Sequence, residues 1–269
     1  MPTPIGNLGD ISKRCLDVLK LCDIMICEDT RVSKNLISLL NSKFELNIAP
    51  KEFYALHTHN VEEFFSRFDA VKFENKVCVY ASDAGFPCIS DPGVDLVRFA
   101  QERGISYEVL PGANAALLAA AASGLIEKEF TFLGFLPNTG KERTLAIQNA
   151  LNSPYPVIVY ESPRRVEALV AAVAELDAER EVFAIKEATK KFETKFRGLA
   201  SELKTTLANS NLNGEWCVVI AGSHAMNTEK ISVADVLALD LPPKQKAKLI
   251  AKITGEDSKI IYQNLIKKS

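Results

Sequence analysis

Val77-Cys78-Val79-Tyr80-Ala81-Ser82-Asp83-Ala84-Gly85-Phe86-Pro87 begins as a short apolar run and ends as a turn. An apolar run of this length, followed by turn residues, is typical of a buried strand. Ile24-Met25-Ile26-Cys27 repeats the pattern upstream, and residues 105–110 predict a third strand. Helical patterns at 94–102 and 113–122 lie near these runs. Strands that alternate with helices predict an α/β domain with a mainly parallel sheet.

A second set of strands follows a boundary that we place near residues 124–136. Apolar runs predict these strands at 130–135, 157–160, 182–185 and 216–220. The C-terminal stretch instead predicts three short helices at 232–239, 243–254 and 258–267. It contains eight lysines and five acidic residues. We therefore expect an α/β domain over 1–125, a second α/β domain over 126–222, and a lysine-rich helical extension of charge about +3 over 223–269.

The composition is that of an ordinary soluble globular protein. The 269 residues are 47% hydrophobic and 25% charged, which suits about two domains. The net charge of −2 excludes a protein-wide basic field, so any nucleic-acid contact needs a local patch. Six cysteines without a CxxC pair predict reduced core residues. We expect no signal peptide and no membrane span, and hence a cytoplasmic protein.

Candidate sites are the loops that follow strands, because ligands of open α/β sheets bind beyond the carboxyl ends of the strands. Residues 82–93 form a loop of about a dozen residues, longer than the usual 2–6, which favours a functional use. Glu28-Asp29-Thr30-Arg31 follows the strand at 24–27 and predicts either a polar site or the first turn of a helix. Gly6 and Gly9, next to a predicted helix start, indicate either a ligand loop or a tight turn.

Two strands of the second half also end in charged loops. Residues 161–165 follow one strand. Residues 186–197 follow the other and contain five basic residues and two acidic ones, Glu187 and Glu193. This basic run predicts either a surface for RNA or another anionic substrate, or a solvated face. No GxGxxG follows a strand, and the stretch 134–141 departs from a phosphate loop in its spacing. The pair His57 and His59 lacks a third ligand, so we expect no metal.

Six motifs in order identify a family. They are Thr3-Pro4-Ile5-Gly6-Asn7-Leu8-Gly9-Asp10-Ile11, Glu28-Asp29-Thr30-Arg31, Ser82-Asp83-Ala84-Gly85-x-Pro87, Ile89-Ser90-Asp91-Pro92-Gly93, Pro111-Gly112-Ala113 and Tyr160-Glu161-Ser162-Pro163. Over residues 2–222 the chain resembles the bacterial small-subunit ribosomal RNA (cytidine-2′-O)-methyltransferases, a branch of the tetrapyrrole methylase superfamily. Its lysine-rich tail is similar to the C-terminal extension of that branch.

The resemblance implies an enzyme that methylates the ribose 2′-hydroxyl of a cytidine in small-subunit ribosomal RNA. It implies two α/β domains with S-adenosylmethionine bound in the cleft between them, and a homodimer. The cofactor-binding residues that it implies are Asp83, Ala84, Gly85, Pro87, Ser90, Pro111, Gly112, Asn114 and Tyr160.

The catalytic candidates are charged residues at strand ends, which we expect to face the cleft. Asp29 is the first candidate for the proton acceptor, Lys186 is the second, and Arg31 is expected to hold a neighbouring phosphate. Glu28, Glu161 and Glu187 complete the set.

Three positions depart from the family pattern. The family begins with an apolar strand before the first motif, whereas here only Met1 and Pro2 precede it, so we expect the N-terminal sheet to lack that strand. Phe86 stands where the family commonly has Thr, and Arg164 stands where it often has His. The alternative functions are carbon methylation of a tetrapyrrole and a non-catalytic RNA-binding role in assembly. The motif at 28–31 and the basic run at 186–197 favour RNA.

Overall fold

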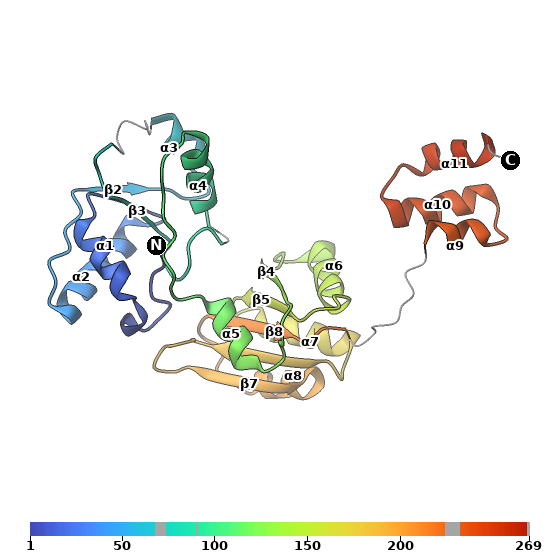
Figure 1. Cartoon of the computed structure of the whole chain (residues 1–269). Coiled ribbons are helices and arrows are strands. Elements are labelled where there is room, and N and C mark those ends of the chain that lie inside the picture. Colours follow the sequence, from blue (N-terminus) through green and yellow to red (C-terminus); the bar gives the residue numbers. More distant parts are fainter. Residues whose placement is uncertain (68–73, 90, 224–231, 268–269) are drawn as a thin grey trace. The chain divides into compact units, whose positions relative to one another are not determined.

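The computed structural model describes residues 1–67, 74–89, 91–223 and 232–267 (Figure 1). It divides into two compact units, Met1–Ser223 and His224–Ser269. The first unit holds two separate sheets, and the second is helical. The α/β class expected from the sequence is therefore confirmed for the first unit.

In the described part of the chain, the N-terminal sheet has three parallel strands in the order β2-β1-β3. These are β1 (Ile24–Cys27), β2 (Glu52–Ala55) and β3 (Cys78–Ala81), which confirms two of the predicted strands. Met25 and Cys27 are buried on one face and Ile24 and Ile26 on the other, so both faces are covered. Burial on both faces explains why these strands are continuous apolar runs. The accompanying helices are η1 (Leu8–Asp10), α1 (Lys13–Leu21), α2 (Thr30–Phe44), α3 (Val61–Arg67) and α4 (Gly93–Glu102).

The strand predicted at 105–110 is wrong. No ladder pairs this stretch with another strand, and Tyr107 and Val109 are 48% and 55% exposed. A strand needs a partner for its backbone groups, and none of the described strands supplies one here. The sequence missed β2, whose residues are all half-buried and whose Glu52 interrupts the apolar pattern.

The second sheet has five strands in the order β4-β5-β8-β6-β7. The strands are β4 (Thr131–Phe135), β5 (Val157–Glu161), β6 (Glu181–Lys186), β7 (Thr194–Leu199) and β8 (Trp216–Ile220). Only β4 and β5 are parallel, and the other neighbours are antiparallel. The four predicted strands are confirmed. β7 was missed because its charged, half-exposed residues lie inside the run interpreted as a basic surface.

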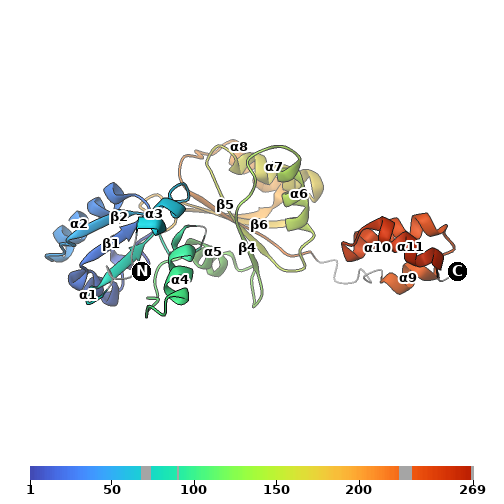
Figure 2. The same cartoon turned by 90° about the horizontal axis from the view of Figure 1, so that it is seen from above.

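Helices cover both faces of the second sheet. The helices α6 (Gly140–Leu151), α7 (Val166–Leu176) and α8 (Ala200–Ala208) pack on one face, and the alanine-rich α5 (Ala115–Ser123) packs on the other (Figure 2). The small side chains of α5 let the helix approach β5, β6 and β8 closely. The N-terminus of α5 is thereby placed beside the carboxyl end of β5, where the candidate site forms.

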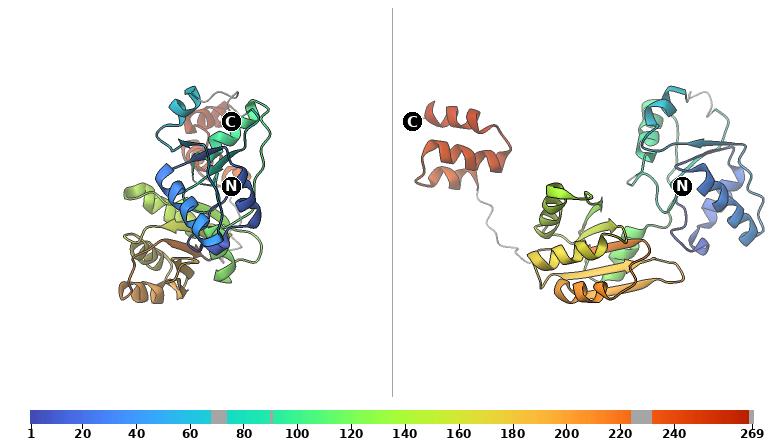
Figure 3. Two further views of the ribbon diagram at one scale, coloured as in Figure 1. Left: turned by 90° about the vertical axis from the view of Figure 1, so that its left-hand side faces the viewer. Right: turned by 180° about the vertical axis from the view of Figure 1, so that it is seen from behind.

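The described residues of the second unit form a bundle of three short helices, as the sequence predicts. These are α9 (Val233–Ala238), α10 (Pro243–Thr254) and α11 (Ser258–Lys267), and α10 packs against both of the others (Figure 3). Val236, Ala247, Ile250 and Ile261 form its own small core. In the parts of the chain that the structure describes, no helix is both long and apolar enough to cross a membrane.

Candidate active site

Buried hydrogen bonds join the N-terminal loop at residues 3–9, which contains Gly6 and Gly9, to the loop after β3. We call this N-terminal loop the first glycine loop. The Gly85 amide donates to Thr3 Oγ1 at 3.0 Å, and the Thr3 amide donates to the Gly85 carbonyl at 2.9 Å. Thr3 Oγ1 in turn donates to the Ser82 carbonyl at 3.3 Å. Because all three residues are buried, these bonds fix two loops that are far apart in the sequence against each other.

A third loop, at 111–114, meets the first two. Gly112 lies against Pro2, so closely that a Cβ on the glycine would overlap the proline ring. Asn114 Oδ1 accepts a hydrogen bond from the Leu117 amide at 2.9 Å and so caps α5. Gly85 has a φ of +85°, which an L side chain rarely adopts, so the turn requires glycine.

A cavity of about 440 Å³ lies between these loops and the carboxyl end of β5. This volume falls in the usual range for small-molecule sites. Five residues singled out from the sequence line it: Ala84, Gly85, Asn114, Tyr160 and Glu161. Twelve further residues line the cavity without having been assigned to the site from the sequence, among them Ile5, Phe86, Phe135, Ile185, Ala188 and Trp216. The signals for Ile5, Phe86 and Ala188 were their places in flagged loops, whereas Ile185 and Trp216 had none, because they are ordinary strand residues.

Glu161 is the buried charge of this cavity, with 2% of its surface exposed. Its carboxylate accepts hydrogen bonds from Arg143 on α6 and from Arg165, each at 2.8 Å, and from the Ser162 amide at 2.8 Å. Burial by itself would raise its pKa, but the bonds from Arg165, Ser162 and Arg143 outweigh burial and hold the pKa below its ordinary value. Glu161 is therefore an anion held in place by two cations.

Among the other polar side chains of the wall, Tyr160 and Cys217 are neutral, whereas Glu215 is an exposed carboxylate paired with Lys190 at 3.1 Å. Burial raises the pKa of Tyr160 and of Cys217 to about 12. The Tyr160 ring packs edge-on against Phe132 and lies 5.6 Å from the ring of Phe135, which is 60% exposed. The cavity therefore offers aromatic surface beside the buried carboxylate of Glu161 and the exposed carboxylate of Glu215.

Three carboxylates meet where β1 and β3 end. The Asp83 amide donates to Glu28 Oε1 at 3.0 Å, and the Asp29 amide donates to Asp83 Oδ1 at 3.1 Å. Burial raises the pKa of Glu28 and of Asp83 above their ordinary values. Hydrogen bonds from the Arg31 side chain and amide instead lower the pKa of Asp29 to about 2. Asp29 is thus the weakest base of the three, and it also begins helix α2 as its cap.

The remaining candidates lie outside the lining of this cavity. Lys186 is 9% exposed; its Nζ donates to the Asn211 carbonyl at 2.7 Å and lies over the Trp216 ring. Glu187 Oε1 accepts hydrogen bonds from Lys190 and from the Glu215 amide, each at 2.9 Å. These contacts join both candidates to neighbouring parts of the same domain.

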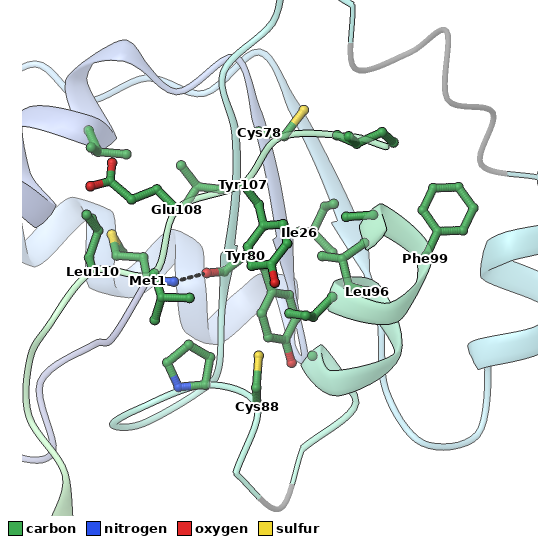
Figure 4. Close-up of a pocket in the computed structure, with 18 of the residues that line it drawn as sticks. Met1, Ile26, Cys78, Tyr80, Cys88, Leu96, Phe99, Tyr107, Glu108 and Leu110 are labelled. Atoms are coloured by element: carbon green, nitrogen blue, oxygen red, sulfur yellow. Dashed lines mark hydrogen bonds between the residues drawn. The ribbon is translucent and has the colours of Figure 1, made fainter. Parts of the chain in front are cut away.

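Five of the nine predicted cofactor residues are not among those that line this cavity. Asp83, Pro111 and Gly112 belong to the three loops but do not line the cavity, and Ser90 lies outside the described residues. Pro87 lines a different, larger cavity of about 650 Å³ along β3 and α4. Figure 4 shows that cavity between Ile26, Leu96, Phe99 and Leu110, with the Met1 amino group donating to the Tyr80 carbonyl at 2.7 Å. Its walls are mainly apolar, so it offers fewer groups for chemistry.

The basic run at 186–197 is mostly paired. Lys190 pairs with Glu187 and Glu215, Lys195 pairs with Glu193 at 2.7 Å, and Arg197 lies 3.5 Å from Glu181. Lys191 is exposed beside Phe192, which is 71% exposed. The run therefore has less unpaired positive charge than its composition indicates.

Known proteins resemble the chain in sequence and in fold. Residues 2–204 match the family of tetrapyrrole (corrin/porphyrin) methylases. The chain is 70% identical over 266 residues to a ribosomal RNA small subunit methyltransferase I of Campylobacter fetus, with 99% of this chain and 98% of the relative aligned. It is 42% identical over 279 residues to the protein of that name from Helicobacter pylori J99, with coverages of 97% and 94%.

Two solved structures share the fold. A cobalt precorrin-4 methyltransferase of cobalamin biosynthesis aligns with a TM-score of 0.58 at 16% identity, covering 82% of this chain and 92% of the other. A uroporphyrin-III C-methyltransferase from Thermus thermophilus, complexed with S-adenyl homocysteine, aligns with a TM-score of 0.54 at 14% identity, with coverages of 81% and 94%. The chain therefore belongs to the tetrapyrrole methylase family, within the group of ribosomal RNA small subunit methyltransferases I that it matches over nearly its whole length.

Proposed function

We propose that this methyltransferase uses S-adenosylmethionine to methylate the ribose 2′-hydroxyl of a cytidine in small-subunit ribosomal RNA. The observation that carries the proposal is the cavity in which three glycine-containing loops meet the end of β5, in a chain of this family. Ala84, Gly85 and Asn114, which belong to the two segments that the sequence resemblance assigns to the cofactor, line this cavity. We further propose that the enzyme acts in the cytoplasm as a homodimer.

The cavity suits a nucleoside-sized ligand without phosphates. At Gly85 an added Cβ would come within 3.0 Å of Ile5 Cγ2, so glycine lets the loop after β3 pack against Ile5 in this wall. The rings of Phe135 and Tyr160 offer faces for an adenine base. Among the described residues, no lysine or arginine lines the cavity, which agrees with a ligand that has no phosphate. When bound, S-adenosylmethionine supplies a methyl group on a positively charged sulfur.

The main task of the protein is alignment of the ribose hydroxyl, which contributes about 7–11 kcal/mol in favourable intramolecular cases. A positioned base adds about 10²–10⁴-fold by taking the hydroxyl proton. Among the three carboxylates after β1 and β3, we propose Glu28 as this base, because its pKa is raised whereas that of Asp29 is about 2. Asp29 then holds Arg31, whose 89% exposed side chain is available to an RNA phosphate.

RNA contacts are expected to concentrate in the C-terminal unit. The whole chain carries −2 and the extension about +3, so residues 1–223 carry about −5. Lys244, Lys248 and Lys252 are exposed at four-residue intervals on α10 and so share one side of the helix. A row of lysines of this kind suits successive phosphates.

The fold neighbours that act on cobalt precorrin-4 and uroporphyrin III make a tetrapyrrole the second candidate substrate. Incubation of the purified protein with labelled S-adenosylmethionine and either small-subunit RNA or uroporphyrinogen III separates the two. We expect label in the RNA alone. Label in the tetrapyrrole, with none in RNA or assembled subunits, would reject the proposal.

A further inference from the structure

The turn after β6 has an unusual backbone. Glu187 and Thr189 both have positive φ, at +54° and +64°. Left-handed backbone is uncommon for any residue other than glycine and is a genuine outlier for a β-branched one. Strained residues of this kind persist where their surroundings hold them, and they cluster at ligand-binding sites. The surroundings of this turn therefore indicate what it is for.

Two carboxylates hold the turn. Glu187 Oε1 accepts from the Glu215 amide and from Lys190 Nζ, each at 2.9 Å. Glu193 Oε2 accepts from the Thr189 amide at 2.7 Å. With its amide fixed in this way, Thr189 directs its hydroxyl at the first glycine loop.

The first glycine loop rests on the turn. The Asn7 amide donates to Thr189 Oγ1 at 3.2 Å. A Cβ added to Gly6 would come within 3.0 Å of that same oxygen and 3.1 Å of the Ala188 carbonyl, and it would overlap the Lys190 side chain. The contact therefore requires glycine at position 6 and places the loop flat against the turn.

This contact lies beside the candidate active site. Ile5, which precedes Gly6, and Ala188, which precedes Thr189, both line the cavity of about 440 Å³. A shift of the loop at Asn7 would move Ile5, and Ile5 in turn packs within reach of Gly85. The position of Thr189 thus sets the shape of the wall where the two domains of the first unit meet.

We propose that Thr189 is a positioning residue for cofactor binding: its hydroxyl anchors the Gly6–Asn7 loop and so fixes Ile5 in the wall of the cavity. The proposal rests on the function proposed above, in which this cavity takes S-adenosylmethionine. Thr189 touches no reacting group and acts through the loop. The hydrogen bond between the Asn7 amide and Thr189 Oγ1 joins the first glycine loop to the turn after β6. The sequence motifs assign no role to Thr189.

The test is the affinity for S-adenosylhomocysteine, measured by calorimetry on the full chain. Thr189→Val keeps the branched shape, and hence the same backbone strain, but removes the hydroxyl. We expect it to raise the Kd about three- to ten-fold, the effect of one lost net hydrogen bond. Its Tm should stay at the wild-type value, because the freed Asn7 amide is exposed and can bind water. Thr189→Ser restores the hydroxyl and should restore the affinity.

A glycine pair supplies an independent comparison. Gly6→Ala should weaken binding at least as much as Thr189→Val, since its Cβ meets the turn. Gly198→Ala in β7 is the control outside this loop, because a single atom, the side-chain oxygen Oε2 of Glu202 at 3.1 Å, lies within 4 Å of its Cβ. It should bind like the wild type.

The outcomes separate the two proposals. Wild-type affinity in Thr189→Val, or a lowered Tm with weakened binding that Thr189→Ser does not rescue, overturns the positioning role while the proposed function stands. A wild-type protein that binds no S-adenosylhomocysteine overturns the proposed function, and the positioning role falls with it.

Discussion

Gly85 stands so close to Ile5 that a Cβ added to the glycine would come within 3.0 Å of Ile5 Cγ2. The pair joins the loop after β3 to the first glycine loop at the cavity wall. We therefore expect Gly85→Val to weaken binding of S-adenosylhomocysteine more than ten-fold in calorimetry. Gly104→Val is the matched control, because Gly104 also has a positive φ, of +64°, but a Cβ there meets nothing within 4 Å. Equal affinities of the two variants would remove this loop from the cofactor site.

The ion pairs of the buried Glu161 carboxylate are expected to contribute to the free energy of unfolding. Glu161→Gln leaves Arg143, whose side chain is 12% exposed, without an opposite charge. Removing one partner of a buried ion pair costs about 3–5 kcal/mol, and the 28% exposure of Arg165 moves the expected loss towards the low end, about 3 kcal/mol. Urea unfolding at pH 7 measures this loss. A loss below 1 kcal/mol would show that the two arginines do not depend on this carboxylate.

The same residue predicts a dependence on pH. The folded-state pKa of Glu161 lies below its ordinary value of 4.5, so its ionised form stabilises the fold. That stabilisation is fully present above about pH 4.5 and is lost as the pH falls through the lower folded-state pKa. The stability difference between wild type and Glu161→Gln should therefore be constant from pH 6 to 8 and shrink below pH 4.5. A difference that grows on acidification would contradict the assignment.

The carboxylates after β1 and β3 differ in their expected kinetic roles. With saturating RNA and cofactor, Glu28→Gln should slow single-turnover methylation about 10²–10⁴-fold, the usual contribution of a positioned base. Asp29→Asn keeps an oxygen that can cap α2 and should leave this rate within a few-fold. Arg31→Ala should mainly weaken RNA binding. The reverse order, with Asp29→Asn slow and Glu28→Gln normal, would return the role of base to Asp29.

The lysines of α10 predict how RNA affinity depends on salt. Changing Lys244, Lys248 and Lys252 together to Gln should leave affinity for S-adenosylhomocysteine unchanged and weaken RNA binding. Each lost phosphate contact reduces the log–log salt slope by roughly 0.7 on single strands, so the slope should fall by about 2. RNA titrations at four salt concentrations give both values. An unchanged slope would place the RNA contacts elsewhere on the chain.

Strands and helices could be predicted from the sequence where one short stretch contains the whole hydrophobic pattern of the element. Prediction from such a pattern has a clear limit. The strands β1 and β3 are apolar runs between turn residues, and the helices of the extension have their own periodicity. Such prediction failed at 105–110, where an apolar pattern lacks the partner that a strand needs, and at β7, which is charged and half-exposed. Local pattern carries no information about which strand lies beside a segment.

In the candidate site too, residues with a local sequence signal could be predicted, whereas contacts between distant segments could not. Gly85 and Asn114 were found because turns and caps are encoded locally. Glu161 was singled out as catalytic, but its environment depends on Arg143, which lies eighteen residues away on α6. The contact between Asn7 and Thr189 spans 182 residues, so only the tertiary structure reveals it.

The activity proposed for this protein is methylation of a cytidine ribose in small-subunit ribosomal RNA. The most direct test incubates the purified protein with S-adenosylmethionine and small ribosomal subunits from cells that lack the gene, digests the RNA to nucleosides, and measures them by mass spectrometry. We expect new 2′-O-methylcytidine with the wild-type protein and less with Gly85→Val at a limiting concentration of S-adenosylmethionine. Subunits that gain no 2′-O-methylcytidine, or that gain a methyl group only on a base, would contradict the proposal.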